Sequence, residues 1–299
     1  MSHLSWLESG VVGLLQGVAE LFPVSSLGHS VLLPAVVGGA WQHDLDVRAP
    51  ESPYLAYIVG LHVATAIALI IYFWRDWVRI VRGLVRSIAR RRIDTADERL
   101  AWLLVLGTIP VGVVGLLAEH AFRTTLARPV PTAVFLVVNG FVLLGIEHFR
   151  GGQPADEEYV DERVSGAESD RRLAGLPTTQ AVAIGAAQIL ALAPGLSRSG
   201  VTTAAGLSAR LSREDAARFA FLLATPVILA AGVLKLGDLA GPLGDGIRPQ
   251  VLFGSVLSGV GAYVSVRFLT RYFASRSMRP FGAYCVAAGA ACLVWFAVR

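Results

Sequence analysis

Residues 16–29 read QGVAELFPVSSLGH, and they place a carboxylate, two hydroxyls and an imidazole inside otherwise apolar sequence. Gln16 and Glu20 are four residues apart, so their side chains share one face if residues 4–22 are helical. Pro23 then ends or kinks that helix, because proline has no backbone N–H and clashes with the preceding turn.

After Pro23 the chain turns and restarts, with Ser25 or Ser26 as the predicted N-cap of a second helix. A helix that breaks inside a membrane is tolerated only where it is buried in protein or lines a wet cavity. Polar residues at such a break indicate a functional site.

The composition supports a membrane setting for this break. The chain has 299 residues, of which 54% are hydrophobic and only 16% charged, and its mean hydropathy is +0.59. About 25% charged residues is usual in soluble domains, so we predict a protein with several membrane spans. The net charge of +4 does not indicate a nucleic-acid partner, because the basic residues lie between apolar runs, where they report topology.

Six apolar segments are long enough to cross a bilayer, which takes about 20 residues in a helix. They are residues 54–74, 100–121, 131–149, 215–237, 249–270 and 280–298. Residues 75–99 contain eight arginines and form a predicted cytoplasmic loop, as does the segment between the last two spans. This topology places both termini on the extracytoplasmic side.

Two broken apolar runs, residues 8–38 and 178–209, are predicted to be re-entrant hairpins. Each is followed by three spans, so residues 1–149 and 178–299 form two repeats of opposite orientation, joined by a mobile polar linker over 150–177. The predicted fold is a single all-α polytopic membrane domain over 1–299, with six transmembrane helices and two re-entrant broken-helix hairpins. Inverted repeats of this kind place their shared site at the repeat interface.

The second break, residues 194–202, reads PGLSRSGVT and has the composition of an anion site. Glycine permits close backbone approach, and a helix that starts near Ser199 would direct its N–H groups at a phosphate. Arg198 adds a planar fork that matches two phosphate oxygens. The predicted phosphate ligands of this loop are Gly195, Ser197, Arg198, Ser199 and Thr202.

Several roles remain open for these residues. Arg198 needs an anionic partner, which is a ligand or, in a purely structural interpretation, Glu20. Glu20 has the hard oxygen atoms that divalent cations prefer. His29 is a general acid or base, a nucleophile, the base that activates Ser26, or a core imidazole with satisfied hydrogen bonds.

Other polar side chains lie within or at the ends of the predicted spans. We expect them to form hydrogen bonds between helices or to lie at the membrane interface. They are His62, Thr65, Asn139, Glu147 and His148.

Three motifs of the sequence, QGVAE at 16–20, PVSSLGH at 23–29 and PGLSRSGVT at 194–202, resemble known signatures. They are similar to the (E/Q)xxxE, PVSSxGH and PGxSRSxxT motifs of the undecaprenyl-pyrophosphate phosphatase family of bacterial inner membranes. The resemblance implies a multi-pass membrane hydrolase that removes the terminal phosphate of a C55 isoprenyl pyrophosphate. The product is the lipid carrier of peptidoglycan synthesis, on which cell shape depends, and the activity implies tolerance of the antibiotic bacitracin.

By the same resemblance, the catalytic residues fall on Glu20, Ser26, His29 and Arg198, and Ser25 joins the phosphate ligands. A Mg²⁺ or Ca²⁺ ion is expected on Glu20 and Gln16, although many members have two acids where this chain has Gln16. The expected partners are the polyprenyl pyrophosphate lipid and a second copy of the chain. The rival interpretation is an inverted-repeat transporter or flippase for a phosphorylated lipid.

Overall fold

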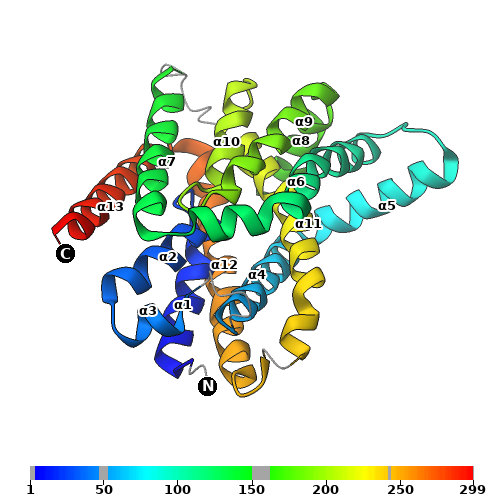
Figure 1. Cartoon of the computed structure of the whole chain (residues 1–299). Helices are drawn as coiled ribbons and strands as arrows, with labels where there is room; N and C mark the ends of the chain where they lie inside the picture. The colour runs from blue at the N-terminus through cyan, green and yellow to red at the C-terminus, as the bar shows by residue number, and fades with distance from the viewer. Residues whose placement is uncertain (1–3, 47–52, 150–161, 242–243, 299) are drawn as a thin grey trace.

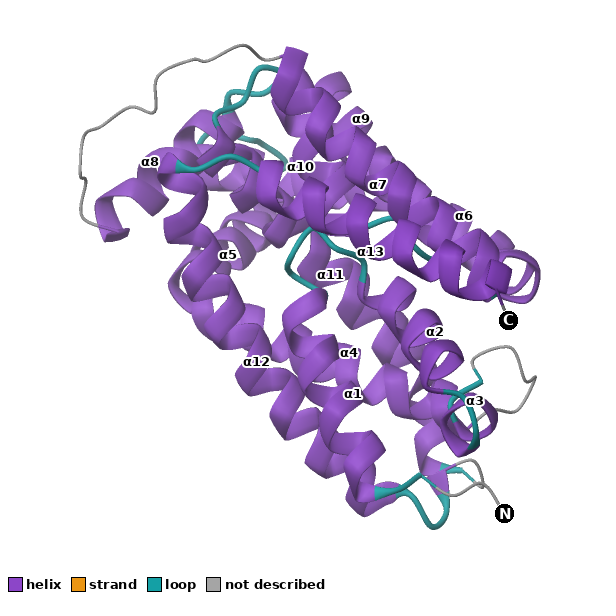
Figure 2. Ribbon diagram, turned by 90° about the vertical axis from the view of Figure 1, so that its left-hand side faces the viewer, coloured by secondary structure: helices purple, strands orange, loops and turns teal. Residues whose placement is uncertain are grey.

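The computed structural model describes residues 4–46, 53–149, 162–241 and 244–298, in which all regular structure is helical (Figures 1 and 2). The first half contains α1 (Trp6–Ala19), α2 (Ser26–Val37), α3 (Ala40–Asp44), α4 (Pro53–Tyr72), α5 (Trp74–Arg90), α6 (Ala96–Leu126) and α7 (Pro129–Phe149). The second half contains α8 (Glu162–Ala174), α9 (Thr178–Ala186), the 3₁₀ helix η1 (Ala187–Leu192), α10 (Arg198–Ser208), α11 (Arg213–Ala240), α12 (Arg248–Ser275) and α13 (Arg279–Val298).

The predicted spans correspond to α4, α6, α7, α11, α12 and α13. By length and composition, five helices of the described residues can cross a membrane: α6, α7, α11, α12 and α13. The apolar helix α4 meets α5 at an angle of 88°, and counting each sharply bent pair as one span gives up to seven. The protein is therefore an all-α polytopic membrane protein.

Both predicted helix breaks are present. The first separates α1 from α2 at residues 20–25, and the second separates η1 from α10 at residues 193–197. Helix α1 ends at Ala19, but helical hydrogen bonds continue to Phe22, whose N–H donates to the Val18 carbonyl at 3.2 Å. Pro23, which has no N–H, ends this pattern. Ser25 is the N-cap of α2, and its hydroxyl accepts a hydrogen bond from the Gly28 N–H.

The two halves of the chain pack against each other in a reciprocal way (Figure 1). Helix α1 of the first half lies on α12 of the second, and α9 of the second half lies on α6 of the first. Both contacts bring glycines against backbone, since a Cβ on Gly17 would lie 2.2 Å from the Ser258 carbonyl oxygen and one on Gly185 would lie 2.1 Å from that of Gly107. In each contact, the first helix of one predicted repeat packs on a span of the other, as expected for two related repeats. The opposite orientation of the repeats stays a prediction.

Two polar segments contain helices that the sequence did not predict. Most of the predicted cytoplasmic connection over 75–99 belongs to the amphipathic helix α5, in which Ile80 is buried and Arg82 and Arg86 are exposed, and its cytoplasmic location stays a prediction.

The described part of the predicted mobile linker contains α8, which is fixed by Asp170. That carboxylate is 2% exposed and accepts hydrogen bonds from Arg218 Nε at 2.8 Å and Arg79 Nη2 at 2.5 Å. The many charged residues of α5 and α8 are typical of loops in a sequence. In the structure, charged side chains of both helices, such as Arg79 and Asp170, form ion pairs with other helices.

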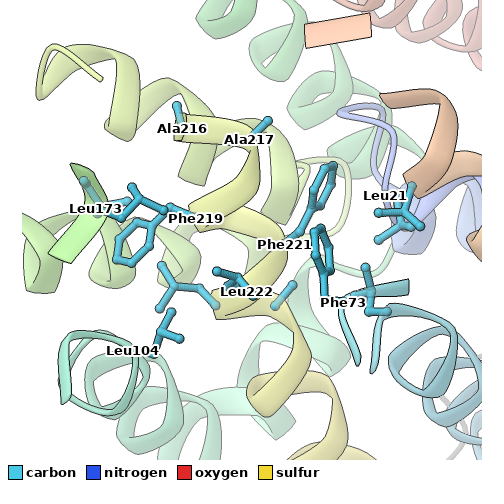
Figure 3. Packing of buried hydrophobic residues seen from close by; sticks show 14 of the residues in the cluster. Leu21, Phe73, Leu104, Leu173, Ala216, Ala217, Phe219, Phe221 and Leu222 are labelled. Carbon is cyan, nitrogen blue, oxygen red and sulfur yellow. The ribbon is translucent and has the colours of Figure 1, made fainter. Parts of the chain in front are cut away.

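The largest hydrophobic cluster surrounds α11 (Figure 3). Phe219, Phe221 and Leu222 of this helix are at most 1% exposed and pack with Phe73 and with residues of α6 and α8. Leu21, which follows Glu20 in the first break, belongs to the same cluster and is 1% exposed. The break is therefore held by packing as well as by hydrogen bonds.

The glycine contact between α1 and α12 yields a stability prediction. We expect Gly17→Ala to lower the free energy of unfolding by about 1–3 kcal/mol, because the added Cβ forces the two backbones apart. Denaturant unfolding of the detergent-solubilised protein measures this change. Gly112→Ala is the matched control, since its Cβ meets nothing within 4 Å. Equal stability of the two variants would contradict the close packing.

Candidate active site

The centre of the site is the carboxylate of Glu20, which lies in the turn after α1 and is 7% exposed. Its Oε1 accepts a hydrogen bond from Arg198 Nη2, so the acid of the first break pairs with the arginine of the second. Its Oε2 accepts from Ser26 Oγ at 2.5 Å and from Gln16 Nε2 at 2.9 Å. The structure thus brings four predicted site residues together around one carboxylate.

Ser25 joins the two breaks through its side chain. Its backbone is left-handed, with φ of 69°, and its Oγ accepts from the N–H of Gly28 at 3.1 Å and from that of Gly195 at 3.2 Å. Gly195 also has a positive φ of 108°, and a Cβ there would lie 2.4 Å from the Thr132 carbonyl oxygen. Only glycine allows this approach, so Gly195 sets the contact between the breaks.

A second joint is made by Asn139 of α7, which is fully buried. Its Nδ2 donates to the Pro23 carbonyl at 3.0 Å, and its Oδ1 accepts from the Ser197 N–H at 3.0 Å. The sequence predicted only a helix–helix hydrogen bond here. No local signal shows that one amide serves both breaks, because its partners are distant in the sequence.

The hydroxyls of the second break are used unequally. Ser197 Oγ caps α10 by accepting from the Gly200 N–H at 3.2 Å, and Ser199 Oγ donates to the Phe22 carbonyl at 3.3 Å. Thr202 Oγ1 is buried and has no hydrogen-bond partner within the described residues. The hydroxyls of Ser197 and Ser199 therefore bind backbone groups and have a structural role, whereas the Thr202 hydroxyl is free to bind a ligand.

His29 and Ser26 form hydrogen bonds with different partners. The Nδ1 of His29 donates to the Ser25 carbonyl at 2.7 Å, and its Nε2 lies 2.7 Å from the hydroxyl of Tyr284, whose ring stacks on the imidazole at 5.8 Å. Of the roles left open for His29, the base that activates Ser26 has no direct hydrogen bond in the structure, because Ser26 turns toward Glu20 while His29 bonds to the carbonyl four residues earlier.

His62 of α4 is the site residue whose importance the sequence did not reveal. Its Nε2 lies 3.2 Å from Gln16 Nε2 and 3.4 Å from Glu20 Oε2. Its Nδ1 donates to the Ile58 carbonyl at 2.8 Å, so Nε2 of the neutral ring accepts from the Gln16 amide. His62 thereby orients Gln16 and, through it, Glu20.

The residues present fit a divalent cation in a limited way. Gln16 Oε1 is buried beside Glu20 without a hydrogen-bond partner among the described residues, and it is a hard oxygen donor of the kind that Mg²⁺ and Ca²⁺ prefer. The described residues contain no group of three or more His, Cys, Asp or Glu side chains that could hold a metal. A cation here would depend on substrate oxygens and water for most of its ligands.

Fold and site together define a polytopic helical membrane protein that buries a carboxylate, a guanidinium and a hydroxyl where two broken helices meet. Comparison with known proteins makes the assignment specific. The family model described as bacitracin resistance protein BacA matches residues 9–291, and the chain belongs to this family.

Relatives resemble this chain over nearly its whole length. The undecaprenyl-diphosphatase of Mycolicibacterium paratuberculosis is 61% identical over 303 residues, covering 100% of this chain and 99% of its own. Undecaprenyl-diphosphatase 1 of Frankia casuarinae is 50% identical over 370 residues, with 100% of both chains covered. Undecaprenyl-diphosphatase 2 of Burkholderia lata is 42% identical, with 95% of both covered. The family expected from the three motifs is confirmed.

The bridge made by Asn139 yields a second prediction. Asn139→Leu leaves the Ser197 N–H buried without a partner and the Pro23 carbonyl with only the weak thiol donor of Cys285 at 3.7 Å, and each such loss costs about 1–3 kcal/mol. We expect the free energy of unfolding to fall by roughly 2–5 kcal/mol in detergent.

Ser258→Ala is the control, because it removes one buried hydroxyl, which donates to the Leu61 carbonyl at 3.3 Å and joins neither break. We expect a loss of about 1 kcal/mol for that variant. If Asn139→Leu is no less stable than Ser258→Ala, the amide does not hold the breaks together.

Proposed function

We propose that the protein hydrolyses undecaprenyl diphosphate to undecaprenyl phosphate and inorganic phosphate in the bacterial inner membrane. The observation that carries the proposal is the buried Glu20, bound to Arg198 and Ser26 at the joint of two helix breaks. Relatives over the full length of the chain are named undecaprenyl-diphosphatase, which supports the same reaction. The reaction returns the lipid carrier to peptidoglycan synthesis and removes the form that bacitracin binds.

Arg198 is the proposed phosphate ligand, and Glu20 holds its place before substrate binds. A diphosphate offers the guanidinium a second anionic partner, and its planar fork suits two phosphate oxygens. Thr202 supplies a hydroxyl without a protein partner in the described residues. The N–H groups at the start of α10 complete the phosphate subsite, with Ser197 and Gly195 shaping it.

Ser26 is the proposed nucleophile and Glu20 its base, since the Ser26 hydroxyl donates to the carboxylate at 2.5 Å. Ser26 Oγ attacks the terminal phosphorus, the bridging P–O bond breaks, and undecaprenyl phosphate leaves. The Ser26 proton passes to Glu20, and water then hydrolyses the phosphoserine. His29, held by Ser25 and Tyr284, is assigned to contact the phosphate rather than to activate Ser26.

Glu20 and Gln16 are the proposed ligands of a Mg²⁺ or Ca²⁺ ion, which would neutralise phosphate charge when bound. The transporter or flippase interpretation gains no support from the named relatives. A homodimer stays a prediction from the sequence.

The reaction itself is the first test of this proposal. Purified protein in detergent, supplied with Mg²⁺ or Ca²⁺ and undecaprenyl diphosphate, is expected to release inorganic phosphate over many turnovers. A variant with Arg198→Lys is expected to turn over about 10²- to 10³-fold more slowly, because lysine keeps the charge but lacks the fork. If folded protein supplied with metal releases no phosphate, the proposal that it is a hydrolase is rejected.

The assignment of nucleophile and base gives a further prediction. Ser26→Ala and Glu20→Gln should each lower turnover at least about 10²-fold, and the double variant should be no worse than either, because the two residues act as a unit. Ser30→Ala, another buried serine of α2, is the control and should retain turnover. Wild-type turnover by Ser26→Ala would reject Ser26 as the nucleophile. The remaining mechanisms would be direct attack by His29 or attack by a metal-activated water.

A further inference from the structure

A groove on the outer face of α12 lies outside the site described above. Its volume is about 680 Å³, and three of its seven lining residues are the arginines Arg267, Arg271 and Arg276. The others are Tyr263, Val264, Phe268 and Tyr272. No carboxylate lines the groove, so it combines a strongly positive lining with an aromatic wall.

Arg267 is the unusual member of this lining. It lies eight residues before Ser275, the last residue of α12, so it sits about 12 Å inside the end of a candidate membrane span. Its exposed neighbours are Tyr263, Val264 and Phe268, which are 40%, 60% and 49% exposed. An arginine on such a face is costly unless an anion pairs with it. Within the described residues, no ion pair joins Arg267 or Arg276 to a carboxylate.

The aromatic wall connects the groove to the first helix break. Phe268 stacks on Phe22 with ring centroids 5.8 Å apart and planes at 8°. Tyr272 lies 5.5 Å from Phe268 and 5.2 Å from Phe281, and Phe281 in turn lies 5.5 Å from Phe22. These four rings form a closed cluster. Its member Phe22 lies two residues after Glu20, and its carbonyl accepts a hydrogen bond from Ser199.

We propose that this groove binds an anionic glycerophospholipid, with the phosphate on Arg267 and Arg276 and an acyl chain along Tyr263, Val264 and Phe268. The arginines complement the negative charge of the headgroup. The exposed apolar residues beside them can contact an acyl chain, which a free phosphate does not have. Basic clusters at the cytoplasmic ends of spans attract anionic lipids, and the arginine count places this end of α12 on that side. The bound lipid packs on Phe268 and Tyr272, the two rings of the cluster that line the groove, and so supports Phe22 through Phe268.

A glycerophospholipid fits better than the diphosphate substrate for two reasons. The diphosphate already has an arginine, Arg198, in the site where Glu20 and Ser26 lie. None of the residues Glu20, Ser26 and Arg198 lines the groove, which meets the first break through the stacking of Phe268 on Phe22. A lipid in the groove is therefore a second ligand with its own headgroup contacts.

Native mass spectrometry of the full-length protein tests the proposal. Delipidated protein in detergent is titrated with phosphatidylglycerol or with phosphatidylcholine, and retained lipid is counted. We expect one phosphatidylglycerol to be retained in preference to phosphatidylcholine. The double variant Arg267→Gln/Arg276→Gln should lose affinity for it by about thirtyfold, because each basic side chain near the surface contributes about one kcal/mol.

The matched control is Arg82→Gln/Arg86→Gln, which removes two exposed arginines of α5 outside the groove and should retain the lipid. Thermal unfolding confirms that both variants are folded, and Arg267→Gln alone serves if the double variant is not. Equal retention in the groove and control variants overturns the proposal, as does equal binding of phosphatidylcholine. Displacement by millimolar inorganic phosphate would assign the groove to free phosphate, and displacement by undecaprenyl phosphate would assign it to the product, so either result also rejects it.

Discussion

Backbone groups at a helix break inside a membrane have no bulk water to bind, and this constraint governs the centre of the protein. Each break satisfies groups of the other. Ser25 accepts from the Gly195 N–H, Ser199 donates to the Phe22 carbonyl, and Asn139 bonds to a carbonyl of one break and an N–H of the other. Neither break would be stable without its counterpart, so the site forms only when both halves of the chain are assembled.

The pairing of Glu20 with Arg198 follows from this assembly. Breaking a buried pair by removing one partner is far more costly than the pair is worth, because the remaining charge stays buried. In the structure Glu20 also accepts hydrogen bonds from Ser26 and Gln16, and His62 Nε2 lies 3.4 Å from its Oε2. The ion pair thus joins the two breaks directly, in addition to the hydrogen bonds of Ser25 and Asn139.

The sequence predicted the features that local chemistry determines. Pro23 and Gly195 mark the breaks, and uninterrupted apolar length marks the spans. It did not predict features that depend on distant partners. His62 reaches Gln16 across 46 residues, and Asn139 reaches Pro23 across 116. Nor did the sequence predict that Ser26 donates to Glu20 rather than to His29, because residue spacing within one helix does not show partners outside that helix.

Buried charges of two kinds occur in this protein, and their surroundings distinguish them. Asp170 is bound by both Arg218 and Arg79, and Arg218 also pairs with Asp76, so this cluster fixes α8 and α5 to α11 as structure. Beside Glu20, by contrast, Gln16 Oε1 is a buried acceptor without a hydrogen-bond partner in the described part of the chain. The other such atoms among the described residues are Trp77 Nε1, Gln188 Oε1, Thr202 Oγ1 and Gln250 Oε1. A buried polar atom without a partner costs stability, which a ligand that supplies the missing bond restores. Glu20 therefore lies beside an acceptor that a ligand can use, whereas Asp170 is surrounded by ion pairs that join helices.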